Sequence, residues 1–128
     1  MTVHFTLNGE SKEMEAKASD LLVDLLRLKL GLRGARPGCL LGQCSSCTVL
    51  FNGSLAPSCL IPAFKVHGSE IVTIEGLMQT REYQDIERGF ARAGVQPCRF
   101  CAAGKFLSIH ALLSLSPNPT DHAIQDTL

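Results

Sequence analysis

Six cysteines restrict what this 128-residue chain can be more than anything else in its sequence. An even number would suit a set of disulfides, but disulfides persist in oxidising compartments. The first ten residues contain no apolar core of an export signal. In a reducing compartment, clustered thiols more often hold a metal. The cysteines therefore predict a metal site in a cytoplasmic protein.

The spacing of the cysteines indicates which metal site to expect. A Cys-x4-Cys-x2-Cys run and one later cysteine comprise Cys39, Cys44, Cys47 and Cys59. This is the ligand pattern of plant-type [2Fe–2S] clusters, in which thiolates converge from a short loop onto the irons. We predict that these four thiolates hold one cluster. Cys98 and Cys101 form a separate Cys-x2-Cys pair.

The charge pattern around the first four cysteines fits an anionic group. No acidic residue occurs from Leu25 to Ser69, and this window holds five basic ones: Arg27, Lys29, Arg33, Arg36 and Lys65. A positive surround favours the reduced, more anionic state of a cluster and raises its potential. The alternative interpretation is a solvated basic face.

The first part of the chain has the pattern of a small mixed sheet wrapped on one helix. Residues 2–7 and 10–17 alternate in polarity around Asn8-Gly9, which predicts a hairpin. A second hairpin is expected from residues 48–51 and 54–56 around Asn52-Gly53, and a fifth strand from residues 71–74. Between the hairpins, the leucines of residues 21–28 predict a helix capped by Ser19 or Asp20 and ended by Gly31 and Gly34.

The last part of the chain is predicted to be helical. Apolar residues recur at helical spacing in residues 82–93 and 100–115, and Thr120 can cap a last helix over residues 121–128. About 50 residues in three helices fall below the size at which a core alone is usually sufficient. We therefore expect this part to need a partner or a metal.

Composition excludes several classes of function. Twelve Lys and Arg balance twelve Asp and Glu, and the aromatic residues are six Phe and one Tyr with no Trp. Neither a net basic field nor a base-stacking platform is present, so a nucleic-acid partner is not expected. No apolar run reaches the 18 or so residues of a membrane span. The four histidines, His4, His67, His110 and His122, have no nucleophile or carboxylate at motif spacing and are interpreted as ordinary surface or packing residues.

A set of motifs in fixed order gives the chain a family resemblance. The motifs are Leu7-Asn8-Gly9, Gly38-Cys39-x-x-Gly42-x-Cys44-x-x-Cys47-Thr48-Val49-Leu50, Ser58-Cys59-Leu60, Thr73-Ile74-Glu75-Gly76-Leu77, Cys98-x-Phe100-Cys101-x-x-Gly104 and Asn118-Pro119-Thr120. In this order they resemble the iron–sulfur subunit of the xanthine dehydrogenase family of molybdenum hydroxylases.

The resemblance implies an α+β fold in two domains. Residues 1–76 would form a β-grasp, plant-ferredoxin-like [2Fe–2S] domain, and residues 77–128 an incomplete helical domain of the kind that binds a second [2Fe–2S] cluster. It also implies a function as the electron-transfer subunit of an oxidoreductase complex. Such a subunit relays single electrons between a molybdopterin centre in a large subunit and FAD in a medium subunit, while substrate chemistry occurs in a partner chain.

The chain departs from the family pattern at several positions. Leu40 and Ser45 stand where the family has glycine, Leu41 stands where it has an acidic residue, and Pro97 replaces a glutamine that approaches the pterin. The family completes its second cluster with a later Cys-x-Cys pair, which this sequence does not contain. We expect a fragment, a natural loss of that cluster, or ligands supplied by another chain, so Cys98 and Cys101 are a possible partial site.

Two other interpretations stay open at this point. Cys44-x2-Cys47 and Cys98-x2-Cys101 could form a structural zinc site, although this leaves Cys39 and Cys59 unused. The lost loop glycines would also suit a metal-free interaction subunit that keeps the fold.

Overall fold

A tight hairpin begins the chain in the computed structural model, which describes residues 1–35, 47–95 and 102–115. Strands β1 (Thr2–Leu7) and β2 (Glu10–Glu15) pair antiparallel. Asn8 and Gly9 both have positive φ, 51° and 84°, as the Asn-Gly signal predicts. The alternation is confirmed too, because Val3, Phe5 and Leu7 are buried.

A second hairpin completes the sheet. It joins β3 (Thr48–Phe51) to β4 (Ser54–Pro57) through Asn52 and Gly53, again at positive φ. Strand β5 (Glu70–Val72) lies parallel to β1 and antiparallel to β3, so the strand order is β2-β1-β5-β3-β4. Strand β5 ends earlier than predicted, because Ile74 begins a helix instead.

The predicted helix at residues 21–28 is present with a different geometry. It starts as α1 (Leu22–Asp24) and continues as the π-helix η1 (Leu25–Lys29), in which the Leu30 N–H bonds to the Leu25 carbonyl at 3.1 Å. A π turn is wider than an α turn and shifts the buried face. Leu28, expected on the apolar face, is therefore 81% exposed.

The ends of this helix also differ from prediction. Leu21 occupies the N-cap position without a side-chain cap, and the Asp20 carboxylate accepts the Lys17 N–H instead. Gly31 has φ 69° just after the helix, as expected of a C-terminal stop. Gly34 is not part of the stop.

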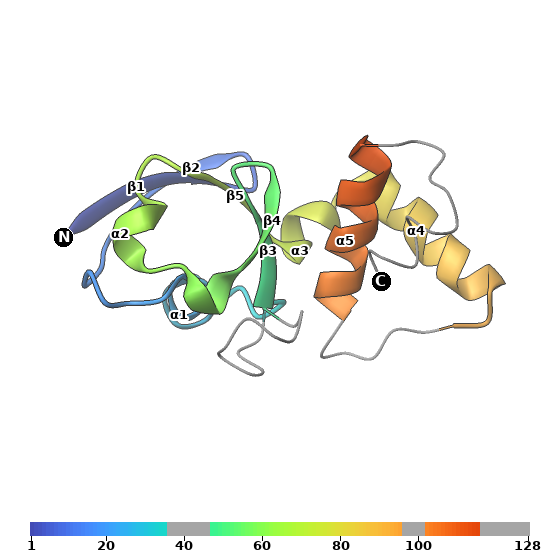
Figure 1. The fold of residues 1–128 in the computed structure, drawn as a ribbon, viewed down its shortest axis with the longest axis horizontal. Helices are drawn as coiled ribbons and strands as arrows, with labels where there is room; N and C mark the ends of the chain where they lie inside the picture. Colours follow the sequence, from blue (N-terminus) through green and yellow to red (C-terminus); the bar gives the residue numbers. More distant parts are fainter. Residues whose placement is uncertain (36–46, 96–101, 116–128) are drawn as a thin grey trace.

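The sheet curves over α1 and α2 (Ala63–Val66), with the short 3-10 helix η3 (Ser58–Leu60) beside α1 (Figure 1). One apolar cluster fills this space, contributed by strands, helices and the segment after η1: Val3, Phe5, Leu7, Ala16, Leu22, Leu25, Leu26, Ala35, Val49, Ile61, Ala63, Val66 and Ile71. This is the β-grasp arrangement, and the predicted α+β fold is confirmed.

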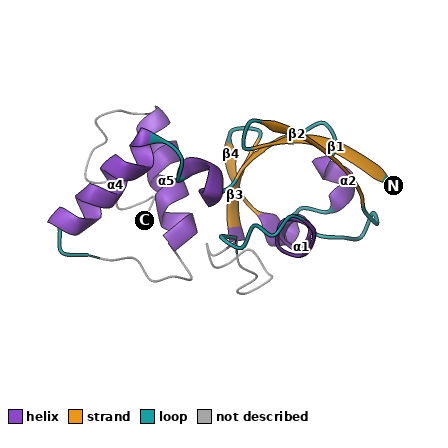
Figure 2. Cartoon of the chain, turned by 180° about the vertical axis from the view of Figure 1, so that it is seen from behind, coloured by secondary structure: helices purple, strands orange, loops and turns teal. Residues whose placement is uncertain are grey.

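Three helices lie on the other side of β3: α3 (Ile74–Leu77), α4 (Arg81–Arg92) and α5 (Ala102–Leu115) (Figure 2). The N-cap of α4 is Thr80, whose hydroxyl accepts the Tyr83 N–H. A second apolar cluster joins these helices to the sheet: Leu50, Ile74, Leu77, Ile86, Phe106 and Leu107. The domain boundary predicted between residues 76 and 77 falls inside α3.

The helix predicted for residues 121–128 lies outside the described residues. Among the helices that are described, none combines the length and the apolar character that a membrane span requires.

Candidate metal centre

Cys47 and Cys59 lie together in the interior. Cys47 immediately precedes β3, and Cys59 lies in η3, just after β4. The β3–β4 pairing places Thr48 opposite Pro57, so the residues flanking this pair are brought side by side. The two Sγ atoms are 3.3 Å apart, with Cys47 1% and Cys59 2% exposed. The sequence prediction that these two cysteines share a site has this contact in its support.

The sulfur separation suits a shared metal better than a disulfide. A disulfide bond is about 2.05 Å long. Two thiolates on one tetrahedral metal, each about 2.3 Å from it, stand about 3.8 Å apart. A separation of 3.3 Å is nearer to the second value. The Cys47 and Cys59 side chains therefore fit the ligand positions of a tetrahedral metal with little movement.

The side chains around this cysteine pair are apolar, and a hydrogen bond holds the Cys47 backbone. Val23 and the partly buried Leu21 pack against the two cysteines. The buried Ser58 hydroxyl donates to the Cys47 carbonyl oxygen at 2.6 Å. Burial of this kind keeps water away from a metal and is one of the means by which a protein tunes a redox centre.

The remaining predicted ligands, Cys39, Cys44, Cys98 and Cys101, lie outside the described residues. Within the described residues alone, no group of three or more metal-binding side chains occurs. The contact favours the iron–sulfur interpretation over the zinc interpretation, since the latter leaves Cys59 without a role.

Two of the basic side chains between Leu25 and Ser69 donate hydrogen bonds to backbone carbonyls. The Arg27 guanidinium donates to the carbonyl oxygens of Arg33 and Ala35, at 3.1 and 3.2 Å. Lys29 donates to the Glu15 carbonyl oxygen at 2.6 Å. These two side chains therefore have structural contacts rather than forming only a solvated face. Arg36 lies outside the described residues.

Glu75, which the sequence did not indicate as a functional residue, contacts the same backbone segment as Arg27. Its Oε2 accepts the Gly34 N–H at 2.7 Å, across 41 residues of sequence. The Thr73-Ile74-Glu75-Gly76-Leu77 motif carries part of the family resemblance, but nothing in it indicates a contact with Gly34.

Three of the four histidines lie in described segments. The His67 Nδ1 accepts the backbone N–H of His4 at 3.1 Å, which is a packing role. The Nδ1 atom of His110 on α5 lies 2.8 Å from the Oε2 atom of Glu82 on α4. The carboxylate partner of His110 was not predicted because it comes from another helix. His122 is outside the described residues.

Comparison with known families gives a match over the second part of the chain. Residues 73–128 match the [2Fe–2S] binding domain family.

Similar proteins cover nearly the whole chain. The nicotinate dehydrogenase small FeS subunit of Eubacterium barkeri is 36% identical over 124 residues, which are 97% of this chain and 79% of that protein. The xanthine dehydrogenase iron-sulfur-binding subunit of Escherichia coli O157:H7 is 33% identical, over 89% of this chain and 71% of its own length.

Solved structures give the same picture. Quinoline 2-oxidoreductase from Pseudomonas putida 86 superimposes with a TM-score of 0.89 at 33% identity, covering 99% of this chain and 78% of that one. Aldehyde oxidoreductase from Desulfovibrio desulfuricans gives a TM-score of 0.88 at 30% identity, over 98% of this chain and 14% of the larger one.

Proposed function

Because the chain belongs to the iron–sulfur subunits of the xanthine dehydrogenase family of molybdenum hydroxylases, we propose that it relays single electrons between a molybdopterin centre and FAD held by partner subunits. Its relatives are subunits of dehydrogenases, so the chain is part of an oxidoreductase complex with larger partners and a [2Fe–2S] cofactor. The molybdopterin-binding large subunit and the FAD-binding medium subunit are our assignment of those partners.

The ligands of the cluster in this proposal are Cys39, Cys44, Cys47 and Cys59. The observation that carries it is the buried contact between the Cys47 and Cys59 sulfurs at 3.3 Å. Thiolates this close would fit one iron, since two thiolates on one tetrahedral metal stand about 3.8 Å apart. Cys47 and Cys59 would therefore hold one iron, and Cys39 and Cys44 the other.

When bound, the cluster supplies a site that accepts and returns one electron at a time. The chain's own residues bury both Cys47 and Cys59 and fix the backbone at Cys47. The Ser58 hydroxyl donates to the Cys47 carbonyl, and the pairing of β3 with β4 brings the strand ends next to the two cysteines together. A rigid, dry ligand shell keeps the same geometry in both oxidation states, which lowers the barrier to electron transfer.

Cys98 and Cys101 are proposed as part of a second site. They fall within the region that matches the [2Fe–2S] binding domain family. A [2Fe–2S] cluster takes four ligands. A second cluster in this subunit would therefore need two ligands besides the six cysteines of this sequence.

Two further assignments belong to the same proposal. Residues 1–76 form the ferredoxin-like domain and residues 77–128 the helical domain. We place the protein in the cytoplasm, where reducing conditions keep thiols available to iron.

The test is a Cys47→Ser variant of the purified complex, compared with Cys101→Ser. We expect Cys47→Ser to lose the electron spin resonance signal of the reduced first cluster, with its iron and acid-labile sulfide, because a hydroxyl is a poor substitute for a thiolate. Cys101→Ser should leave that signal unchanged. A full-strength signal in Cys47→Ser would refute the ligand assignment. If this chain in the wild-type complex held one zinc and no iron, the zinc site would be established instead; if it held no metal, the interaction subunit would be.

A further inference from the structure

The backbone of residues 33–35 is held by two side chains of opposite charge. The Arg27 guanidinium donates to the carbonyls of Arg33 and Ala35, and the Glu75 carboxylate accepts the Gly34 N–H at 2.7 Å. Ala35 is itself 2% exposed. Residues 33–35 are therefore fixed immediately before the segment that carries Cys39 and Cys44.

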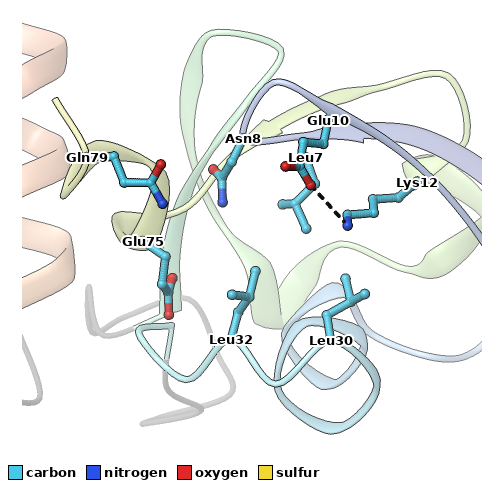
Figure 3. A pocket seen from close by; sticks show the side chains of 8 residues that line it. All are labelled: Leu7, Asn8, Glu10, Lys12, Leu30, Leu32, Glu75 and Gln79. Carbon is cyan, nitrogen blue, oxygen red and sulfur yellow. Dashed lines mark ion pairs between the residues drawn. The ribbon is translucent and has the colours of Figure 1, made fainter.

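Glu75 reaches this segment from α3. Figure 3 shows its carboxylate pointing away from the helix toward the loop that follows Leu32, at one side of a pocket of about 190 Å³. The approach is close, because a Cβ on Gly34 would overlap Ile74 Cγ2 and stand 2.9 Å from Glu75 Oε2. Only glycine lets the backbone come this near to α3.

The second carboxylate oxygen of Glu75 is buried, and it has no hydrogen-bond partner among the described residues. Among the described residues, the Glu75 carboxylate therefore acts on the backbone through Oε2.

Asn8 fixes the start of α3. Its Oδ1 accepts the Thr73 N–H at 2.9 Å, and its Nδ2 donates to the Thr73 hydroxyl at 3.0 Å. Thr73 is buried and directly precedes α3. The β1–β2 turn thus holds the element from which Glu75 projects, so the Glu75 carboxylate is presented from a fixed base.

The far end of the cysteine-bearing segment is held as well. Ser58 donates to the Cys47 carbonyl at 2.6 Å in the interior. The described residues on either side of 36–46 are therefore anchored, at residues 33–35 and at Cys47. Fixing both ends of a chain segment removes conformations from it and so lowers the entropy lost when its side chains bind a ligand.

We propose that Arg27 and Glu75 are positioning residues for the cluster, which anchor residues 33–35 so that Cys39 and Cys44 can reach the metal carried by Cys47 and Cys59. The inference rests on the proposed function. Neither side chain is a ligand. Both act through the backbone before residue 36.

The test measures how fast a chelator removes iron from the purified complex, followed by the loss of visible absorbance. Glu75→Ala removes one charge-assisted hydrogen bond and Arg27→Met removes two, so we expect iron loss about tenfold faster than in the wild type in both variants. Glu75→Gln keeps an acceptor for the Gly34 N–H and should restore the slow rate. The melting temperature of each variant is measured beside its rate of iron loss. If Glu75 only supported global stability, Glu75→Gln would not restore the slow rate while its melting temperature stayed the same as that of Glu75→Ala.

Two exposed residues provide matched controls. Glu13→Ala in β2 and Arg88→Met in α4 remove the same charges away from residues 33–35, and both should lose iron at the wild-type rate. If Glu75→Ala or Arg27→Met fails to fold, Glu75→Asp decides, because it keeps the charge but is one methylene shorter. Faster iron loss in Glu75→Asp than in Glu75→Gln supports the proposal.

Hydrogen exchange gives a second readout. The amides of residues 33–35 should exchange faster in Glu75→Ala than in Glu13→Ala. Iron loss and exchange at control rates in both the Arg27 and Glu75 variants would overturn the positioning role while leaving the proposed function intact. A wild-type complex without iron would instead overturn the proposed function.

Discussion

Gly34 has no room for a side chain. Its Cα faces Ile74 and Glu75 of α3, and a Cβ there would overlap the Ile74 side chain. Ile74 belongs to the apolar cluster that joins α3 to the sheet, so it has little freedom to move. The identity of this residue is set by a contact with a segment some forty positions away.

Gly34→Ala should therefore lower the free energy of unfolding by about 1–3 kcal/mol, because the added methyl forces the loop away from α3. The measurement is chemical denaturation of the metal-loaded protein. Gly89→Ala is the control, since Gly89 is an exposed helical residue with open space around it. That variant should gain about 0.5–1 kcal/mol. Equal effects of the two substitutions would mean that the close approach at Gly34 carries no cost.

Single residues were predictable where a local rule applied. The cysteine spacing predicts that Cys47 and Cys59 share a metal cluster, and the structure places their sulfurs 3.3 Å apart. Glu75 followed no such rule, since its bond to Gly34 depends on how α3 packs on the sheet. Contacts between distant segments leave no periodic signal in one sequence.

At the scale of elements, the hairpins were more predictable than the helices. Asn8-Gly9 and Asn52-Gly53 fix their turns through φ values that few residues adopt, so their strands were placed correctly. The helix at residues 21–28 was expected to keep a 3.6-residue period. Its π turn at Leu25–Lys29 broke that period and exposed Leu28, and no sequence signal marks such a turn.

Helices α4 and α5 are joined by aromatic and polar contacts. The ring of Tyr83 stacks on that of Phe106, with centroids 4.7 Å apart. Burial raises the pKa of Tyr83 above its ordinary value, and the neighbouring charge and hydrogen bond of Glu87 raise it further. The phenol is thus held in its neutral form between the two helices.

The raised pKa of Tyr83 makes the stability of the fold depend on pH in one direction. A pKa higher in the folded state than in the unfolded one stabilises the fold below about pH 10, and this contribution is lost as the pH rises through the folded-state pKa. Tyr83 is the one tyrosine of the chain, so alkaline difference absorbance reports on it alone.

We expect the midpoint in the folded chain to exceed that of the chain in denaturant. Glu87→Gln should lower the folded midpoint without bringing it down to the denatured value, because burial is the larger cause. A folded midpoint at or below the denatured one would show that the ring is not buried against Phe106.

In the molecule as a whole, the sheet contributes side chains to both apolar clusters. One face closes over α1 and α2, while Leu50 of β3 takes part in the cluster with α3 and α5. Strand β3 therefore lies between the two predicted domains, with Cys47 directly before it. The α+β class and the order of parts were predictable from motif order, whereas the packing of α3 against the sheet and against Gly34 was not.

In the proposed ligand set, Cys47 and Cys59 bind the same iron of a [2Fe–2S] cluster. Anomalous diffraction at the iron edge, from crystals of the metal-loaded complex, measures whether they do. We expect an iron peak about 2.3 Å from both sulfurs, with a second iron beside it. No iron peak within bonding distance of both sulfurs, or a peak there at the zinc edge instead, would contradict it.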